Sequence, residues 1–344
     1  MRRLVLGLYD PTPAWTVPEA EVQRLSRDFP DLEIVRTGSI EELGGAIPAA
    51  EILFSWAPGE PLMARAERLR WLHTAAAGVG AYLTPSLRQR NVAVTNSRGV
   101  HAIPIAEHSI GMLLALARGL RAAVLEQAVQ GMDRARWYVG PGQPRELFGR
   151  TLGLFGYGAI GREIARRGLA MGMRVIALRR RPDRPPEWAR ELLQALDLPQ
   201  EEPRVDEMLG PAAFDRLLSE SDALVIAAAH TQETHGVFDA RAFERMRRGA
   251  YLVNVARGKI VREQDLVHAV RSGILAGAGL DVFETEPLPR ESELYTLDNV
   301  ILTPHISGYS AKFWPRAMAL FRENLRRDLA GLPLVNRVNV EQGY

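Results

Sequence analysis

Three side chains with complementary chemistry, Arg257, Glu286 and His305, each follow a predicted strand in the second half of the chain. A guanidinium can hold a carboxylate and a neighbouring carbonyl through two parallel hydrogen bonds. A histidine, whose ordinary pKa lies near neutrality, can donate a proton to a forming alkoxide or remove it in the reverse direction. We expect Glu286 to hydrogen-bond His305 and to stabilise its imidazolium form. Together these groups would suit the reduction of a 2-keto acid, provided that a hydride donor binds beside them.

A glycine-rich turn indicates where such a donor would bind. The apolar run Thr151–Phe155 leads into the turn Gly156-Tyr157-Gly158-Ala159-Ile160-Gly161, then a helical segment to about Met171 and a second apolar run, Arg174–Leu178. In this order of elements the glycines permit a tight turn and a close approach to a pyrophosphate, and the helix N-terminus adds unpaired N–H groups. The segment therefore predicts a dinucleotide site whose phosphates lie beside Gly156, Gly158, Ala159, Ile160 and Gly161.

Three arginines, Arg179, Arg180 and Arg181, follow the second of these apolar runs. Dinucleotide-binding folds that use NAD carry an acidic residue at this point, which binds the ribose hydroxyls. Arginine would instead attract a 2′-phosphate through charge-assisted hydrogen bonds. We therefore predict that NADP(H) is preferred and that NAD(H) remains possible as a cofactor.

The segments that position these residues alternate between strand and helix patterns, which is typical of parallel α/β sheets. In the first hundred residues we expect strands near 4–8, 32–35, 51–56, 69–73 and 92–95, and helices near 19–29, 40–47, 62–69 and 82–89. A long apolar helix is expected from Pro104 to about Val129, and a terminal helix over 313–329. Between them we expect six strands, over 151–155, 174–178, 223–228, 250–255, 277–282 and 299–302. An exposed excursion with one short helix (187–196) is expected between Pro182 and Pro203.

Length and composition narrow the class of protein. A chain of 344 residues with 47% hydrophobic and 24% charged residues favours two ordinary globular domains. A net charge of +2 gives no indication of a nucleic-acid or acidic-membrane partner. The absence of cysteine excludes disulfides, thiol nucleophiles and cysteine-ligated metals, and the histidines lack metal-ligand spacing, so no metal is expected. The apolar run at the N-terminus ends at Leu8 and is too short for a signal peptide, so we expect a cytoplasmic protein. The apolar stretch Ala102–Leu120 is interrupted by charged residues, so we expect no membrane span.

Read together, the motifs resemble the D-isomer-specific 2-hydroxyacid dehydrogenase family. They occur in the family's order over nearly the whole chain: Ala77-Gly78-Val79-Gly80, Ile105-Ala106-Glu107-His108, the glycine turn, Asn254-Val255-Ala256-Arg257-Gly258, Leu280–Pro289 and Leu302–Gly308. The resemblance implies two doubly wound parallel-sheet α/β domains of the Rossmann and flavodoxin-like type. It implies that residues 1–98 and 308–344 form a substrate domain, and that residues 99–307 form an inserted NAD(P)-binding domain. It also implies a homodimer joined through the cofactor domain.

The same resemblance assigns residue roles. Arg257, Glu286 and His305 become the catalytic residues, and Gly78 with the backbone amides of Val79 and Gly80 would receive the substrate carboxylate. Asp281 becomes the expected contact for the nicotinamide carboxamide. Besides the glycine turn, the arginines and Asp281, the expected cofactor contacts are Ala229, Thr234, Val255, Ala256 and His305. Two departures from the family pattern stand out: Ala229-His230-Thr231 replaces the usual Pro-Leu-Thr, and Arg179 occupies the place of the NAD-selecting aspartate.

The leading hypothesis is an NADPH-dependent reductase of a small 2-keto acid such as glyoxylate or hydroxypyruvate. An NAD-dependent D-3-phosphoglycerate dehydrogenase is an alternative, although its substrate needs additional cations in the first domain. A cofactor-sensing binding protein of the same fold, like the C-terminal-binding-protein corepressors, would keep the same three catalytic residues. Formate dehydrogenases resemble this family with glutamine in place of the glutamate, so Glu286 argues against that activity.

Overall fold

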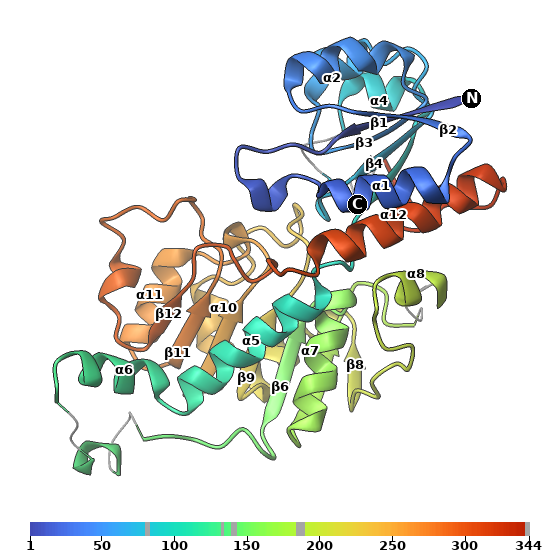
Figure 1. The fold of residues 1–344 in the computed structure, drawn as a ribbon. Helices are drawn as coiled ribbons and strands as arrows, with labels where there is room; N and C mark the ends of the chain where they lie inside the picture. The colour runs from blue at the N-terminus through green and yellow to red at the C-terminus, as the bar shows by residue number, and fades with distance from the viewer. Residues whose placement is uncertain (80–82, 132–133, 139–142, 184–189, 341–344) are drawn as a thin grey trace. The chain divides into compact units, whose positions relative to one another are not determined.

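The computed structural model describes residues 1–79, 83–131, 134–138, 143–183 and 190–340. The chain divides into two compact units. Unit 1 comprises Met1–Val100, Trp188–Gln200 and Ser310–Tyr344, and unit 2 comprises His101–Glu187 and Glu201–Tyr309. Each unit is a parallel sheet flanked by helices, which confirms the predicted fold class (Figure 1).

Unit 1 contains, among the described residues, a five-stranded sheet in the order β2-β1-β3-β4-β5 with parallel pairing throughout. This is the order of flavodoxin-like doubly wound sheets. The strands are β1 (Arg2–Gly7), β2 (Leu32–Arg36), β3 (Ile52–Ser55), β4 (Trp71–Thr74) and β5 (Ala93–Asn96). The helices are α1 (Glu19–Asp28), α2 (Ile40–Ala46), α3 (Gly59–Ala64), α4 (Pro85–Gln89), α8 (Arg190–Ala195) and α12 (Phe313–Leu329), with short 3₁₀ helices at Pro13–Trp15 and Ile47–Ala49.

Unit 2 contains a seven-stranded parallel sheet within the described residues, in the order β12-β11-β10-β9-β6-β7-β8. The strands are β6 (Thr151–Phe155), β7 (Arg174–Leu178), β8 (Glu207–Leu209), β9 (Ala223–Ile226), β10 (Ala250–Asn254), β11 (Leu275–Leu280) and β12 (Val300–Leu302). With β6 counted as the first strand, the sheet from β8 to β11 follows the dinucleotide-binding order 3-2-1-4-5-6, and β12 is added at the far edge beside β11. The edge strand β8 was absent from the six expected strands, because three residues carry no readable alternation.

The helices of unit 2 cover both faces of this sheet. They are α5 (Ala102–Ala117), α6 (Leu120–Ala128), α7 (Ala159–Ala170), α9 (Phe214–Glu220), α10 (Ala240–Arg245) and α11 (Glu263–Arg271), with 3₁₀ helices at Ala135–Trp137, Pro211–Ala213, Gly258–Ile260 and Glu293–Thr296. Apolar residues of α5 and α7 pack on one face, and residues of α9, α10 and α11 pack on the other (Figure 1). The strands are therefore buried on both faces, as their apolar runs indicate.

The long helix expected from Pro104 to Val129 is two helices, α5 and α6, which meet at a bend of 68°. Gly119 lies at the break with a left-handed φ of 65°, and a Cβ atom there would approach the Trp137 ring to 2.4 Å. The expectation of one continuous helix is therefore wrong, because glycine both permits the turn and leaves room for the ring. Among the described residues no single helix has the length and hydropathy of a membrane span, and α5 with α6 meets that measure only as a bent pair.

The excursion between Pro182 and Pro203 contains the expected short helix, α8, but its described residues are not exposed throughout, contrary to the expectation. Four leucines of this segment are buried: Leu192, Leu193, Leu196 and Leu198. Helix α8 contacts α12, so the segment groups with unit 1, although its flanking residues belong to unit 2. Burial of each leucine contributes about 1.5–3 kcal/mol, which explains why a segment rich in proline and glutamate still packs against the protein.

Candidate active site

The register of the unit 2 sheet brings the ends of five strands into one row. Phe155, Ile226, Asn254, Leu280 and Leu302 are paired across neighbouring parallel strands. The residues that follow these positions therefore leave the sheet at the same edge. This edge is the carboxyl end of the sheet, where ligands bind in open α/β folds. Motifs separated by as many as 150 residues in the sequence thus meet at one place.

The glycine turn fits a dinucleotide phosphate group. Gly156 has a φ of 106°, and a Cβ on it would lie 2.5 Å from the backbone nitrogen of Ala228. A Cβ on Gly161 would lie 2.3 Å from the carbonyl oxygen of Gly156. Gly158 is different, because nothing in the protein lies within 4 Å of its Cβ position and its φ is an ordinary −101°. No packing within the described chain requires glycine there, whereas a phosphate approaching the uncapped N-terminus of α7 would.

The arginines lie beside this turn. The amide of Gly156 donates to the carbonyl of Leu178, the last residue of β7, so Arg179 begins next to the turn. Arg179 is half-buried, and its Nη2 donates to the carbonyl of Pro182 over 2.8 Å. Its Nε is buried and has no hydrogen-bond partner among the described residues. An orphaned guanidinium N–H at this edge suits a phosphate oxygen, while Arg180 and Arg181 are exposed.

Asn254 organises the loop that carries Arg257. Its side chain is buried, accepts from the amide of Ala256 over 3.1 Å, and donates to the carbonyl of Arg257 over 3.1 Å. A Cβ on Gly258 would lie 1.8 Å from the carbonyl carbon of Phe283. Glycine is therefore required for this loop to lie against the loop that leads to Glu286. The guanidinium of Arg257 is exposed at the site, with Nη1 donating to the carbonyl of Ala256 over 2.6 Å.

His305 and Glu286 form the expected pair. The Nδ1 of His305 lies 2.7 Å from Oε2 of Glu286, and Oε1 of Glu286 accepts from the amide of Phe283 over 3.1 Å. The side chains are 48% and 36% exposed, so the pair is open to a ligand. With Nδ1 held by the carboxylate, Nε2 is the ring nitrogen that can face a substrate.

Asp281 anchors the loop around His305. It is fully buried, and its carboxylate accepts from the hydroxyl of Thr303 over 2.6 Å and from the amides of Ile306 and Ser307 over 2.9 and 3.0 Å. These contacts lie on both sides of His305, which has a left-handed φ of 55°. Asp281 therefore holds the loop in a conformation that a non-glycine residue rarely adopts. Its expected contact with the nicotinamide carboxamide stays a prediction.

The remaining expected cofactor residues also follow strands at this edge. After β9, the hydroxyl of Thr234 donates to the carbonyl of Ala229 over 2.8 Å and closes a short turn. Within that turn Nε2 of His230 lies 3.0 Å from Nδ1 of His235. Burial, followed by the charges of His235, Lys259 and Arg257, lowers the pKa of His230. Val255 and Ala256 are buried directly after β10.

The expected substrate loop follows β4 at the carboxyl end of the unit 1 sheet. The carbonyl of Ala77 accepts from the side-chain amide of Asn96 over 2.7 Å, which ties the loop to the end of β5. Gly78 is exposed and Val79 is buried, whereas Gly80 lies outside the described residues. The two predicted residue groups thus fall in different units, with Gly78 and Val79 in unit 1 and Arg257 in unit 2.

His73 supports this loop from within β4. Its Nδ1 lies 2.7 Å from the hydroxyl of Thr95, which also accepts from Nε1 of Trp71, and its Nε2 lies 3.3 Å from the hydroxyl of Ser97. The ring is fully buried, and this desolvation lowers its pKa to about 3. His73 is therefore a neutral core histidine.

We predict that His73 makes the protein acid-sensitive. Because its folded-state pKa lies far below the unfolded value of about 6.5, its contribution is complete above pH 6.5 and is lost as the pH falls toward 3. The free energy of unfolding should fall by roughly 1 kcal/mol per pH unit in that window. Urea unfolding of His73→Gln between pH 4 and 7 should give a shallower slope than wild type. The same change at the exposed His268 is the control, and an equal slope in wild type and His73→Gln would contradict the prediction.

Comparison with known proteins identifies the fold's family. Residues 110–307, more than half of the chain, match the model of the D-isomer specific 2-hydroxyacid dehydrogenase, NAD binding domain. The chain belongs to the D-isomer-specific 2-hydroxyacid dehydrogenase family. The dehydrogenase is therefore an oxidoreductase that acts on the CH–OH group of hydroxy acids.

The relatives of the dehydrogenase are named for different activities. It is 33% identical over 279 residues to the glyoxylate reductase of Korarchaeum cryptofilum, covering 80% of this chain and 78% of that protein. It is 30% identical over 328 residues to the D-3-phosphoglycerate dehydrogenase of Archaeoglobus fulgidus, covering 94% of this chain but only 58% of that longer protein. A Sinorhizobium meliloti structure described as an NADPH-dependent glyoxylate/hydroxypyruvate reductase, in complex with NADP and sulfate, matches with a TM-score of 0.78, 25% identity and 100% coverage of both chains.

Sequence reasoning about the dehydrogenase missed the residues that hold the site together. Asn254 and Gly258 lie within a recognised motif but carry no reactive group, and Thr303 is recognisable only through its bond to Asp281. His108 adds to this support, with Nε2 lying 3.0 Å from the hydroxyl of Thr303. The signal that could have found them is their position beside the ends of strands β10, β11 and β12.

Proposed function

We propose that this dehydrogenase is an NADPH-dependent reductase of a small 2-keto acid, of the size of glyoxylate or hydroxypyruvate, that forms the D-2-hydroxy acid. The observation that carries the proposal is the arrangement of Arg257, Glu286 and His305 at one sheet edge, next to a glycine turn followed by arginines rather than an acid. The names of the glyoxylate reductase of K. cryptofilum and of the S. meliloti reductase support it.

In this proposal the chain's own residues bind the keto acid, orient it and protonate it. The guanidinium of Arg257 binds the carboxylate and carbonyl oxygens and withdraws charge from the carbonyl. His305, held through Nδ1 by Glu286, donates the proton on Nε2 to the forming alkoxide, and Glu286 stabilises the imidazolium before that transfer. The bound nicotinamide supplies the hydride. The expected contact of the backbone amides of Val79 and Gly80 with the substrate carboxylate stays a prediction.

The cofactor preference gives a direct test of the proposal. We expect kcat/KM for NADPH to exceed that for NADH in wild type, with glyoxylate or hydroxypyruvate as substrate. Arg179→Asp should lower kcat/KM for NADPH by about 10- to 100-fold, because it removes charge-assisted hydrogen bonds and adds repulsion toward a 2′-phosphate. It should lower kcat/KM for NADH much less, since an acid at this point suits the ribose hydroxyls.

The matched control is Arg241→Asp, the same charge reversal on an exposed residue of α10. Values of kcat/KM that are equal for the two cofactors, or higher for NADH, in wild type would contradict the proposed cofactor.

A panel of 2-keto acids, together with D-3-phosphoglycerate and NAD in the oxidative direction, tests the proposed substrate. The similarity to the A. fulgidus protein makes D-3-phosphoglycerate the second candidate substrate. Absence of turnover across the whole panel would favour a cofactor-sensing binding protein.

We also infer a homodimer. Helix α6 carries large exposed apolar side chains: Leu120, Val124 and Leu125, followed by Val129 directly after the helix. The exposed fraction reaches 77% at Val129, which is unusual for an apolar residue of a monomeric protein when its neighbours are also exposed. Light scattering at micromolar concentration measures the mass, and a monomer would contradict this inference.

A further inference from the structure

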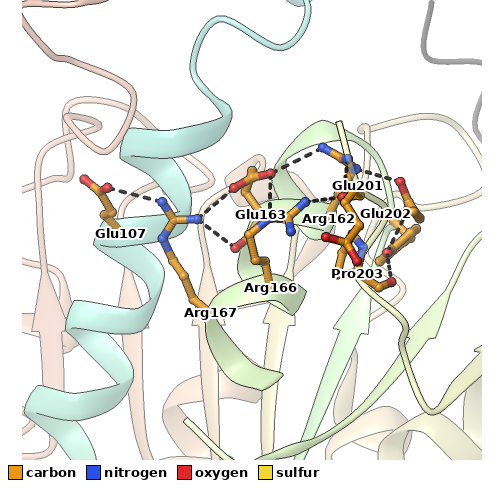
Figure 2. A network of polar contacts seen from close by, with 9 residues as sticks. Glu107, Arg162, Glu163, Arg166, Arg167, Glu201, Glu202 and Pro203 are labelled. Carbon is orange, nitrogen blue, oxygen red and sulfur yellow. Dashed lines mark hydrogen bonds and ion pairs between the residues drawn. The ribbon is translucent and has the colours of Figure 1, made fainter. Parts of the chain in front are cut away.

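A polar network attaches the segment that ends the α8 excursion to the helix that begins at the glycine turn. Figure 2 shows this network, with arginines of α7 pointing at Glu163 and at the segment Glu201–Pro203. Nη2 of Arg162 donates to the carbonyl of Glu201 over 2.8 Å, and Nη2 of Arg166 donates to the same carbonyl over 2.5 Å. All of these groups belong to unit 2.

Glu202 lies at one end of this network and links it to the glycine turn. Its Oε2 accepts from Nε of Arg162 over 2.6 Å, and its Oε1 accepts from the hydroxyl of Tyr157 over 3.0 Å. The hydroxyl of Tyr157 also lies 3.3 Å from the carbonyl of Pro203. One carboxylate thus holds two points of the nucleotide motif: the second residue of the glycine turn and the first turn of α7.

Both groups that Glu202 holds are buried. Arg162 is 1% exposed and lies 3.4 Å from Glu163, while Tyr157 is 7% exposed. Burial, and then the charge of Glu202, raises the pKa of the Tyr157 hydroxyl, so it remains a donor at any working pH. A buried guanidinium that lost one of its carboxylates would have to move or admit water. Glu202 thus supplies one of the two carboxylates of a buried guanidinium and an acceptor for a buried hydroxyl.

The residues just before Glu202 belong to the α8 excursion. The buried leucines Leu192, Leu193, Leu196 and Leu198 fasten the preceding residues into unit 1, where α8 contacts α12. Only three residues, Pro199, Gln200 and Glu201, separate the last of these leucines from Glu202. The chain therefore passes from the residues packed in unit 1 to the polar network of unit 2 within a few residues.

We propose that Glu202 is a positioning residue for the dinucleotide site, which holds the glycine turn through Tyr157 and the start of α7 through Arg162. The turn must keep its backbone amides directed at a phosphate, and a contact behind Tyr157 limits how far the turn can shift away. The proposal rests on dinucleotide binding at this turn, but it does not depend on which of the two cofactors is preferred.

Titration of the whole protein with NADPH and with NADH, followed by nucleotide fluorescence, tests the proposal. We expect Glu202→Ala to raise the Kd of both nucleotides by about five- to tenfold, and Tyr157→Phe to raise it about threefold, because each change frees the turn. The double variant should raise Kd little more than Glu202→Ala alone, since both substitutions remove the same contact. With saturating cofactor, kcat should change less than twofold.

The matched control is Glu201→Ala, which removes a carboxylate one residue away but retains the backbone carbonyl that Arg162 and Arg166 bind. It should leave both Kd values unchanged. A lower melting temperature of Glu202→Ala with unchanged Kd would overturn the proposal, because Glu202 would then only stabilise the fold. Tyr157→Phe keeps the ion pair between Glu202 and Arg162, so its effect on Kd still tests the proposal if Glu202→Ala folds poorly. A wild-type preference for NADH would contradict the proposed function, whereas the ratio of variant to wild-type Kd would still test Glu202.

Discussion

Replacing His305 with glutamine should lower kcat for keto-acid reduction by about 10²- to 10⁴-fold, the range expected when a general acid is removed. Glutamine keeps hydrogen-bonding capacity toward Glu286 but cannot supply a proton to an alkoxide. The KM for the keto acid should change far less than kcat, because Arg257 still binds the carboxylate. Steady-state kinetics with saturating NADPH, across pH 5 to 9, measures both constants.

Two further variants make this result specific. Glu286→Gln leaves a side chain of the same size beside Nδ1 of His305 but removes the charge that stabilises an imidazolium, so the reductive rate should fall. His268→Gln changes an exposed histidine of α11 and should leave kcat unaltered. Full activity of His305→Gln would remove His305 from the mechanism and would leave the proton donor unassigned.

Much of this architecture could be predicted from the sequence, because the strands of a doubly wound sheet are apolar runs and their ends carry the motifs. The pairing of Glu286 with His305 follows from two such ends, β11 and β12, lying next to each other. The convergence of the widely spaced motifs could be predicted because the carboxyl ends of parallel strands lie at one edge of the sheet. The structure adds the register, which sets the ends of five strands level with one another.

The features that sequence reasoning missed depend on tertiary contacts with weak local signals. The three-residue strand β8 exists because β7 offers it an edge, and the bend at Gly119 depends on the room that Trp137 requires. The excursion from Pro182 to Pro203 has the composition of an exposed segment, yet its leucines bury themselves against unit 1. A polar segment with a few well-spaced leucines can either extend into solvent or pack against the protein. Only the tertiary packing decides between these two outcomes.

The side chain of Arg257 gives the second large expected effect. Arg257→Lys should lower kcat/KM for the keto acid by about 10²- to 10³-fold, because lysine keeps the charge but cannot make two parallel hydrogen bonds to carboxylate and carbonyl. Both KM and kcat should change, since the guanidinium contacts the substrate in the ground state and stabilises the charge that develops on the carbonyl oxygen. The Kd of NADPH should remain as in wild type, which separates this effect from damage to the cofactor site.

Lys259 offers a control in the short helix that directly follows Arg257. It is exposed two residues after Arg257, so Lys259→Met removes a positive charge from the neighbourhood without touching the guanidinium. If the electrostatic field of the loop alone mattered, Lys259→Met would lower kcat/KM and Arg257→Lys would not. If bidentate binding matters, Arg257→Lys lowers kcat/KM and Lys259→Met does not. Asn254 and Gly258 hold the backbone of Arg257 in one place, and from there only a planar guanidinium can make two parallel hydrogen bonds to the substrate. A kcat/KM for Arg257→Lys within threefold of wild type would therefore refute its assignment as the substrate-binding arginine.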